Sequence, residues 1–377
     1  MSASEARLVE LAGRSDASDP AHALREALTG VMRGLAAAGG GPHEIEAMRW
    51  AAPDPAAFHP SRRAIELAYR EVCGGFRPRP VLTTGAGPGL IVQARAVVGP
   101  ASDEPVYRSF SLRELAREYS PRGQVPDMGA VFARWTRDGA VFRQDHTALD
   151  LAYGRSPTET LDLYRPQRPG RLPVWAFIHG GYWQASTKEQ HAQFATGMLQ
   201  AGFAVANIEY GLAPETSLAA IVAQIHAALR FLVDEAGALG IDPDQLHLAG
   251  HSAGAHLAAM AACDTNGPPI RSALLLAGLF DLEPLGHLPV GRLLGLSDPD
   301  AIRRLSPSNL RRPTGAQIWV AVGGRESAEF KRQSDEIARA WGTPAVLTVE
   351  DANHFDLLDG LIDGALLGHA RALASGS

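Results

Sequence analysis

Cysteine is scarce in this sequence, and long apolar runs and an excess of basic charge are lacking. Only Cys73 and Cys263 occur in 377 residues, which indicates two buried thiols in a reducing, cytoplasmic compartment rather than a disulfide framework. No run approaches the ~20 apolar residues of a membrane helix. With 35 basic and 41 acidic side chains, the net charge is −6, so we expect neither nucleic acid nor a membrane as partner.

Motifs for metal ions and phosphate groups are also lacking. The sequence has no His-Glu-x-x-His pattern and no cysteine–histidine cluster, so no metal site is expected. The glycine-rich run at 85–89 contains a proline and precedes no helix, so we interpret it as a turn rather than a phosphate-binding loop. We therefore expect neither a metal nor an organic cofactor.

The composition changes near residues 100–130, and we place the boundary between two domains after residue 102. Residues 1–20 are polar, without the basic-then-apolar order of a secretory signal, and are expected to form a flexible tail. Residues 21–102 are expected to form a small α+β domain, too small to bury much surface alone. Its predicted elements are helices at 21–38 and 60–72 and strands at 45–50, 81–83 and 90–98.

Residues 103–377 alternate between strands and helices. Such alternation predicts an α/β domain with a mostly parallel, doubly wound sheet. The expected strands are 161–164, 173–178, 204–209, 245–249, 273–277, 317–322 and 345–349. The expected helices include 218–235, 253–262, 328–341 and 358–374.

The strongest local signal for chemistry is Gly250-His-Ser-Ala-Gly254, between a strand and an apolar helix. A sharp strand-to-helix turn exposes the hydroxyl of Ser252, and glycines on both sides avoid collisions across the turn. This setting predicts that Ser252 is a nucleophile.

A second signal follows the predicted strand 173–178, in His179-Gly-Gly-Tyr-Trp183. Glycines leave backbone N–H groups open to a substrate, as the oxyanion of a tetrahedral intermediate requires. The expected donors are the amides of Gly180 or Gly181 together with Ala253, the residue after the nucleophile. A plain glycine turn at a strand end is the alternative interpretation.

A general base should come last in the chain order of serine, acid and histidine. His354 follows the final predicted strand, and it is the only histidine at such a strand end downstream of Ser252. For the acid we prefer Glu326, on the loop after strand 317–322, because a carboxylate there can orient the imidazole. Asp281 is the alternative, although its neighbours suggest a helix cap.

From about Tyr107 to its end, the chain resembles the kynurenine formamidase branch of the α/β hydrolases. The matching motifs include Leu161-Asp-Leu-Tyr-Arg-Pro166, the 179–183 loop, Glu209-Tyr-Gly-Leu-Ala-Pro-Glu215, the Ser252 turn and Asn353-His-Phe-Asp356. The resemblance implies an α/β-hydrolase fold and a triad of Ser252, Glu326 and His354, with glutamate where the family often has aspartate. It also implies removal of a formyl group from an aryl formamide, or cleavage of small esters.

Residues 21–102 resemble a truncated domain of the Rid family of enamine and imine deaminases, a chorismate-mutase-like fold. The likeness lies in 31–40, 50–58, 66–79 and 89–97, and the opening strands of that family are expected to be missing. The family's carboxylate-binding arginine falls nearest Pro80, one position from Arg79, and Gln93 stands where an acidic residue is usual. We therefore expect a remnant used for packing or for assembly of a homo-oligomer.

We expect a cytoplasmic serine hydrolase acting on a small-molecule acyl substrate. Tyr182, Trp183 and His251 are the residues expected to contact it, and the proline- and leucine-rich segment 282–313 is a candidate lid. Two alternatives stay open, a general carboxylesterase and a fusion whose Rid-like domain has the main role.

Overall fold

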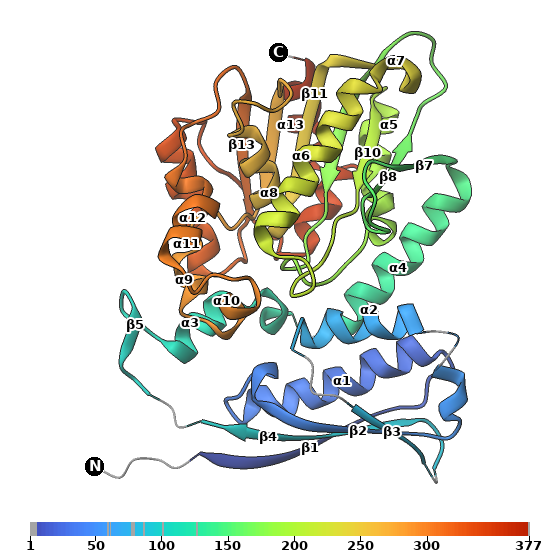
Figure 1. Ribbon diagram of the computed structural model, residues 1–377, viewed down its shortest axis with the longest axis vertical. Coiled ribbons are helices and arrows are strands. Elements are labelled where there is room, and N and C mark those ends of the chain that lie inside the picture. The colour runs from blue at the N-terminus through green and yellow to red at the C-terminus, as the bar shows by residue number, and fades with distance from the viewer. Residues whose placement is uncertain are drawn as a thin grey trace. The chain divides into compact units, whose positions relative to one another are not determined.

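The structure is a computed structural model that describes residues 6–58, 60, 62–76, 80–85, 87–99, 102–125 and 127–375 (Figure 1). The chain forms two compact units. The first comprises residues 1–117, 122–133 and 184–186, and the second comprises 118–121, 134–183 and 187–377. The first unit thus extends beyond the expected domain boundary after residue 102.

The first unit is an α+β fold with a four-stranded sheet in the order β1-β4-β2-β3. Its strands are β1 (Arg7–Ser15), β2 (Ile45–Ala52), β3 (Pro80–Thr84) and β4 (Leu90–Val98), and helices α1 (Pro20–Ala37) and α2 (Arg62–Cys73) pack on one face. Strand β2 runs parallel to β3 and antiparallel to β4. The remaining elements are η1 (Pro42–Glu44), η2 (Pro55–Phe58), β5 (Pro105–Tyr107), β6 (Phe110–Ser111), α3 (Leu112–Glu118) and η3 (Pro121–Gln124).

Strand β1 corrects the expectation of a flexible tail over residues 1–20. Residues 7–15 pair antiparallel with the whole of β4, from Arg7 opposite Val98 to Ser15 opposite Leu90. The missing side chain of Gly13 lets α1 approach, because a Cβ there would lie 1.8 Å from the Ala27 carbonyl oxygen. At least one strand therefore precedes the first helix, contrary to the expected loss of opening strands.

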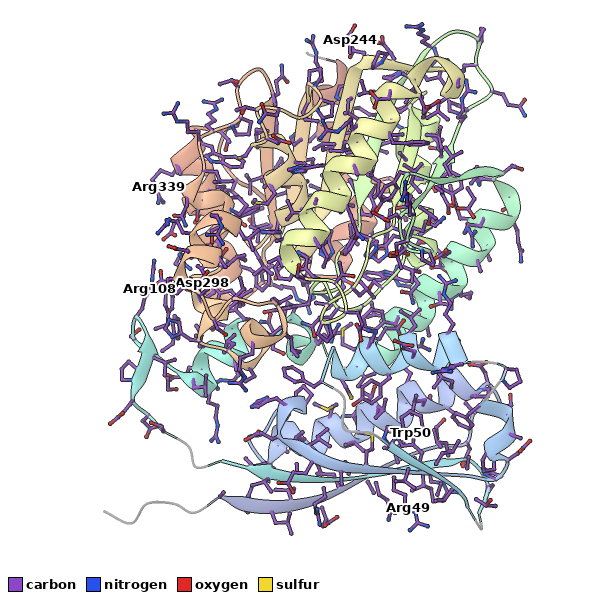
Figure 2. The ribbon with its side chains drawn as sticks, viewed as in Figure 1. Arg49, Trp50, Arg108, Asp244, Asp298 and Arg339 are labelled. Atoms are coloured by element: carbon purple, nitrogen blue, oxygen red, sulfur yellow. The ribbon has the colours of Figure 1, made fainter. Side chains whose placement is uncertain are left out.

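Alternation along β2 determines which side chains enter the core of the first unit. Arg49 and Trp50 point to opposite faces of the sheet (Figure 2), and Trp50 is buried beside Tyr69 of α2 at a ring distance of 6.2 Å. The position expected for the Rid-family arginine includes Arg79, which lies outside the described residues. Gln93 is exposed on β4.

The second unit contains an eight-stranded sheet in the order β14-β13-β12-β11-β9-β10-β8-β7. The pairs from β14 to β10 are parallel, whereas β8 runs antiparallel to both β10 and β7. The strands are β7 (Ala148–Ala152), β8 (Thr160–Tyr164), β9 (Leu172–Ile178), β10 (Ala204–Ile208), β11 (Ile241–His251), β12 (Ser272–Leu276), β13 (Gln317–Gly323) and β14 (Leu347–Val349). The mostly parallel sheet is confirmed, and β7 is an additional strand.

Helices cover both faces of this sheet. Helices α6 (Leu218–Asp234) and α8 (Ala253–Ala262) pack together on one face, while α5 (Thr196–Gln200) and α13 (Ala365–Ser375) lie on the other (Figure 1). The remaining elements are α4 (Met128–Asp145), η4 (Glu189–Ala195), α7 (Ala236–Leu239), α12 (Ala328–Trp341) and η6 (Asp356–Leu361). The single helix expected at 358–374 is wrong, because η6 and α13 are separate elements.

The segment expected as a lid folds into short helices. They are α9 (Glu283–Gly286), α10 (Pro289–Leu293), α11 (Pro299–Leu305) and η5 (Pro307–Asn309). The Ser306 hydroxyl oxygen accepts from Leu282 N–H at 3.0 Å, and Ser308 N–H donates to the Phe280 carbonyl at 2.9 Å. These two hydrogen bonds join the beginning of the segment to residues 306–308 near its end. The role of the segment as a lid stays a prediction.

The topology gathers the candidate residues at one edge of the sheet. Strands β9, β11, β13 and β14 are parallel, so the loops that follow them leave from the same edge. These loops hold Gly180, Ser252, Glu326 and His354, respectively.

Candidate active site

Ser252 occupies a strained turn between β11 and α8. Its backbone has φ 56° and ψ −119°, a combination that costs a non-glycine residue of the order of 1–3 kcal/mol. The Ser252 N–H is held by the Leu276 carbonyl of β12 at 2.8 Å. The side chain thus projects from the turn at the N-terminus of α8, where helix N–H groups favour negative charge.

Two glycines make this turn possible. A Cβ at Gly250 would lie 2.1 Å from the Gly254 carbonyl oxygen, and a Cβ at Gly254 would lie 2.0 Å from the Ile178 carbonyl oxygen at the end of β9. Both are backbone contacts that side-chain motion cannot relieve. The glycine spacing is therefore a steric requirement of the turn and of its packing against β9.

The predicted oxyanion loop lies beside the serine. A Cβ at Gly180 would be 3.3 Å from the Ser252 Cβ and 2.9 Å from the His251 carbonyl oxygen. Gly181 follows with φ 108°, a conformation that favours glycine. Among the described residues, the backbone N–H groups of Gly180, Gly181 and Ala253 have no hydrogen-bond acceptor. Three backbone donors next to one hydroxyl could receive an oxyanion.

His354 and Glu326 are in direct contact. The His354 Nδ1 lies 2.9 Å from Oε1 and 3.1 Å from Oε2 of Glu326, and both side chains are buried. Because a carboxylate only accepts, Nδ1 carries the proton and Nε2 is left as the basic nitrogen.

His251 and Phe330 hold His354 from two sides. The His251 Nε2 lies 2.8 Å from the His354 carbonyl oxygen, and the Phe330 ring of α12 packs edge-on against the His354 ring at 4.8 Å. Burial lowers the pKa of His251 well below its usual value, so its ring stays neutral. His251 is only 2% exposed and contacts the His354 backbone, and its contact with a substrate stays a prediction.

Asp281, the alternative acid, lies in a different setting. Its Oδ1 accepts from Glu283 N–H at 3.0 Å, as expected of a residue that caps a turn. Its own N–H donates to the Gln333 Oε1 at 2.9 Å. The carboxylate that contacts His354 in the structure is that of Glu326.

Tyr182 and Trp183 have different environments. The Tyr182 hydroxyl donates to the Tyr119 carbonyl at 3.1 Å, and the side chain is half-buried. Trp183 is fully buried and packs edge-on against His256 at 5.0 Å. Contact with a substrate thus stays a prediction for Tyr182, and the burial of Trp183 favours a packing role.

Sequence reasoning missed a group of residues behind the oxyanion loop. The His179 Nε2 lies 3.0 Å from Glu209 Oε1, and the Tyr210 hydroxyl donates to the His179 carbonyl at 2.8 Å. Strands β9 and β10 are parallel neighbours in which Ile178 pairs with Ile208. His179 directly follows Ile178, and Glu209 directly follows Ile208. A histidine and a carboxylate at the ends of two successive predicted strands are the signal that could have indicated this contact.

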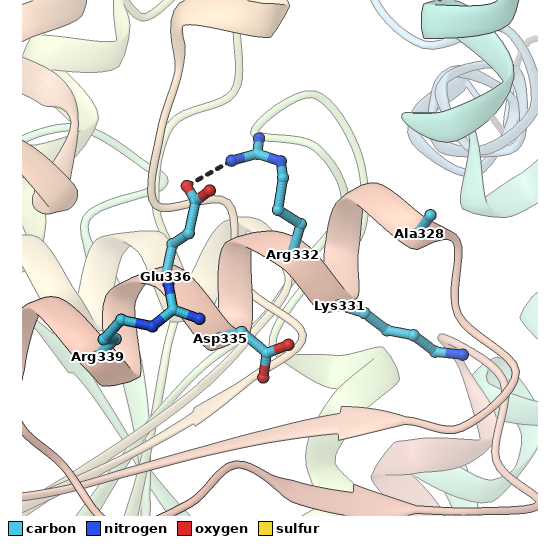
Figure 3. Close-up of a pocket in the computed structure, with 6 residues that line it drawn as sticks. All are labelled: Ala328, Lys331, Arg332, Asp335, Glu336 and Arg339. Atoms are coloured by element: carbon cyan, nitrogen blue, oxygen red, sulfur yellow. Dashed lines mark hydrogen bonds and ion pairs between the residues drawn. The ribbon is translucent and has the colours of Figure 1, made fainter.

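A surface hollow lies elsewhere, along α12 (Figure 3). Its lining is charged and includes Arg332, which pairs with Glu336 at 2.5 Å. The lining residues are Ala328, Lys331, Arg332, Asp335, Glu336 and Arg339. The opposite, buried side of α12 carries Phe330 against His354.

Neither a metal cluster nor a membrane span is found in the described part of the chain. There, no three His, Cys, Asp or Glu side chains are grouped so that they could hold a metal ion. No described helix is both long and apolar enough to cross a bilayer.

The fold and its strand-end site define the chain as an α/β hydrolase. The profile of the BD-FAE family matches residues 161–274. A provisionally named thioesterase from Silicibacter sp. TM1040 has 29% identity and a TM-score of 0.61, over 67% of this chain and 97% of that one. Esterase LipW from Mycobacterium marinum shares the fold at 21% identity and a TM-score of 0.55, over 66% and 88%.

Curated relatives define the family more narrowly. Kynurenine formamidase of Danio rerio is 30% identical over 279 residues, covering 68% of this chain and 94% of the relative. That of Salmo salar is 32% identical over 281 residues with the same coverage. The chain belongs to the kynurenine formamidase family and is a hydrolase of the formamidase and esterase type.

Proposed function

We propose that the chain hydrolyses an aryl formamide with Ser252, His354 and Glu326 as its catalytic triad. The observation that carries the proposal is the buried contact of 2.9 Å between Glu326 and His354, on loops from the sheet edge that also bears the Ser252 turn. The family relationship supplies the substrate class, because the matched relatives are named kynurenine formamidases.

The reaction proceeds through a formyl-enzyme. His354 Nε2 takes the proton of the Ser252 hydroxyl as the oxygen attacks the formamide carbon. The backbone N–H groups of Ala253 and the Gly180–Gly181 loop bind the oxyanion, and His354 then gives its proton to the leaving arylamine nitrogen. Water attacks the formyl ester by the same proton route, which releases formate and restores the serine.

A panel of formamides and esters tests this proposal. We expect formate release from N-formylkynurenine to exceed turnover of p-nitrophenyl acetate, and Ser252→Ala to abolish both. Unchanged turnover in Ser252→Ala would refute the triad. A large preference for short-chain esters would instead favour a general carboxylesterase; LipW, which shares the fold, is named an esterase.

We propose a separate assembly role for the first unit, in keeping with its likeness to a Rid-type remnant. Leu8 of β1 and Val81 of β3, on the two edge strands of the sheet, are 58% and 61% exposed, and an exposed edge strand can pair with a second copy. Light scattering of the full chain should show an oligomer that Leu8→Lys with Val81→Lys dissociates. A monomeric wild type would exclude the assembly role.

The segment 282–313 is also proposed as a lid over the acyl site. The His256 Nε2, one turn after Ser252, lies 2.7 Å from the Leu305 carbonyl oxygen, which couples this segment to α8. Substitutions at half-buried Val290 should change the preference among acyl chain lengths. An unchanged preference would leave the segment as a structural connection.

A further inference from the structure

The His179 ring lies between two groups that accept hydrogen bonds. Its Nδ1 is 2.8 Å from the Gly180 carbonyl oxygen, and its Nε2 is 3.0 Å from Glu209 Oε1. A carbonyl has no proton to give, and neither has an ionised carboxylate. Both contacts are hydrogen bonds only when both ring nitrogens carry protons.

Both carboxyl oxygens of Glu209 face backbone N–H donors. Its Oε1 also accepts from Tyr210 N–H at 3.1 Å, and its Oε2 accepts from Lys188 N–H at 3.1 Å. Hydrogen bonds from backbone donors stabilise a carboxylate relative to the neutral acid. The proton shared across the contact with His179 is therefore assigned to the imidazole.

We propose that His179 is a buried imidazolium, paired with Glu209, that orients the peptide groups of the oxyanion loop. The inference rests on the proposed function, since it gives His179 a positioning role in that reaction. His179 touches no reacting atom in this scheme. It acts through the loop backbone, whose N–H groups receive the oxyanion.

The orientation follows from the geometry of a trans peptide, in which C=O and N–H point in opposite directions. The Gly180 carbonyl is held by His179 Nδ1 at 2.8 Å, so the N–H of Gly181 in the same peptide points away from the ring. The His179 carbonyl is held by the Tyr210 hydroxyl at 2.8 Å, which turns the Gly180 N–H away in the same manner. Both N–H groups are thus left without an acceptor within the described residues.

The other titratable groups around the ring are compatible with one positive charge. His191 stacks on His179 at 5.4 Å, and burial together with the neighbouring His179 lowers the pKa of His191 to about 3, so His191 stays neutral. Tyr210 also stacks on the His179 ring, at 4.3 Å, and burial raises the pKa of Tyr210 well above the usual value. Tyr153, whose hydroxyl donates to the Glu209 carbonyl at 2.6 Å, also has a raised pKa because of burial.

The nearest ammonium group is already paired with other carboxylates. The Nζ of Lys188 contacts Asp150 at 2.9 Å and also Asp162, whereas only the backbone N–H of Lys188 reaches Glu209. The Glu209 carboxylate is therefore left to His179 as its charged partner.

Nitrogen-15 NMR of the histidine-labelled full chain tests the charge directly. We expect both ring nitrogens of His179 to be protonated at pH 7.5, with the signal assigned by its loss in His179→Gln. An unprotonated nitrogen at that pH would overturn the proposal. This readout needs no turnover, so it separates failure of the inference from failure of the proposed triad, which Ser252→Ala tests.

Kinetics of Glu209→Gln supply the second readout. The amide keeps an acceptor but removes the charge that stabilises the imidazolium, so kcat should fall about tenfold to a hundredfold while KM changes less than about twofold. Binding of phenylboronic acid, which forms a tetrahedral adduct with a serine, should weaken in parallel.

The matched control is Glu235→Gln, an exposed position after α6, which should leave kcat and KM unchanged. A Glu209→Gln variant that raises only KM, or that keeps the kcat of the wild type, would overturn the positioning role. Should that variant not fold, the NMR measurement on the wild type still decides the charge.

Discussion

The Nδ1 of His354 faces both carboxylate oxygens of Glu326, at 2.9 Å and 3.1 Å. A single N–H thus has two acceptors on one side chain, which restricts rotation of the imidazole. Glutamate reaches this position from the loop after β13 with one methylene more than aspartate has. The position of this loop therefore suits the longer side chain of glutamate, and an aspartate would need the loop to lie closer to His354.

Replacing Glu326 by glutamine should leave the fold intact but impair the base. The amide can present its N–H₂ to the ring and stabilise the wrong tautomer, so we expect kcat to fall by about 10³–10⁴-fold. Glu326→Asp should be intermediate, because its carboxylate falls short of Nδ1. Steady-state kinetics with N-formylkynurenine measure both, and Asp281→Asn is the comparison variant. A larger loss in Asp281→Asn would assign the acid to Asp281.

A methyl group at Gly254 should disrupt the contact between the serine turn and β9. The Cβ would lie 2.0 Å from the Ile178 carbonyl oxygen, so we expect Gly254→Ala to destabilise the protein by more than about 3 kcal/mol. Urea denaturation measures this change. Gly237→Ala is the control, because a Cβ there meets nothing within 4 Å, and it should be neutral or slightly stabilising. Equal stability of the two variants would contradict the packing described.

Stability should fall as the pH drops below about 6.5, in part because of His256. Burial lowers its folded-state pKa from 6.5 to about 4, so the unfolded chain binds a proton first as pH decreases. The contribution is complete above the unfolded pKa and is lost between pH 6.5 and 4, with about 2 kcal/mol lost by pH 5. His256→Gln, which retains a donor for the Leu305 carbonyl, should lose less stability between pH 7.5 and pH 5. An identical loss in both proteins would exclude His256 as a contributor.

The buried ion pair of the first unit should be sensitive to removal of one partner. Arg25 Nε lies 2.6 Å from Glu71 Oε2, and the Glu71 side chain is fully buried. Arg25→Met removes this partner from a buried charge and should cost about 3–5 kcal/mol. The exposed Arg49→Met should cost less than about 0.5 kcal/mol. Thermal unfolding compares the two variants. Similar melting temperatures would show that the Arg25–Glu71 ion pair does not contribute to stability.

The sequence predicted the parallel sheet because its strands are continuous apolar runs with turn residues at their ends. It did not predict β1, because the exposed positions of Arg7–Ser15 carry charges and Leu8 faces solvent, so the alternation typical of a strand is obscured. Spacing along the chain placed Ser252, Glu326 and His354 at strand ends. The contact between His179 and Glu209 depends on the spatial order of β9 and β10, which spacing alone does not reveal.

The backbone of Ser252 has a consequence for how this enzyme can change. At φ 56° and ψ −119°, glycine would fit the turn with less strain than serine, so the folded state gains nothing from the residue that the reaction requires. Selection for stability alone would remove the nucleophile. A lineage that keeps serine at this position therefore records continuing selection for activity.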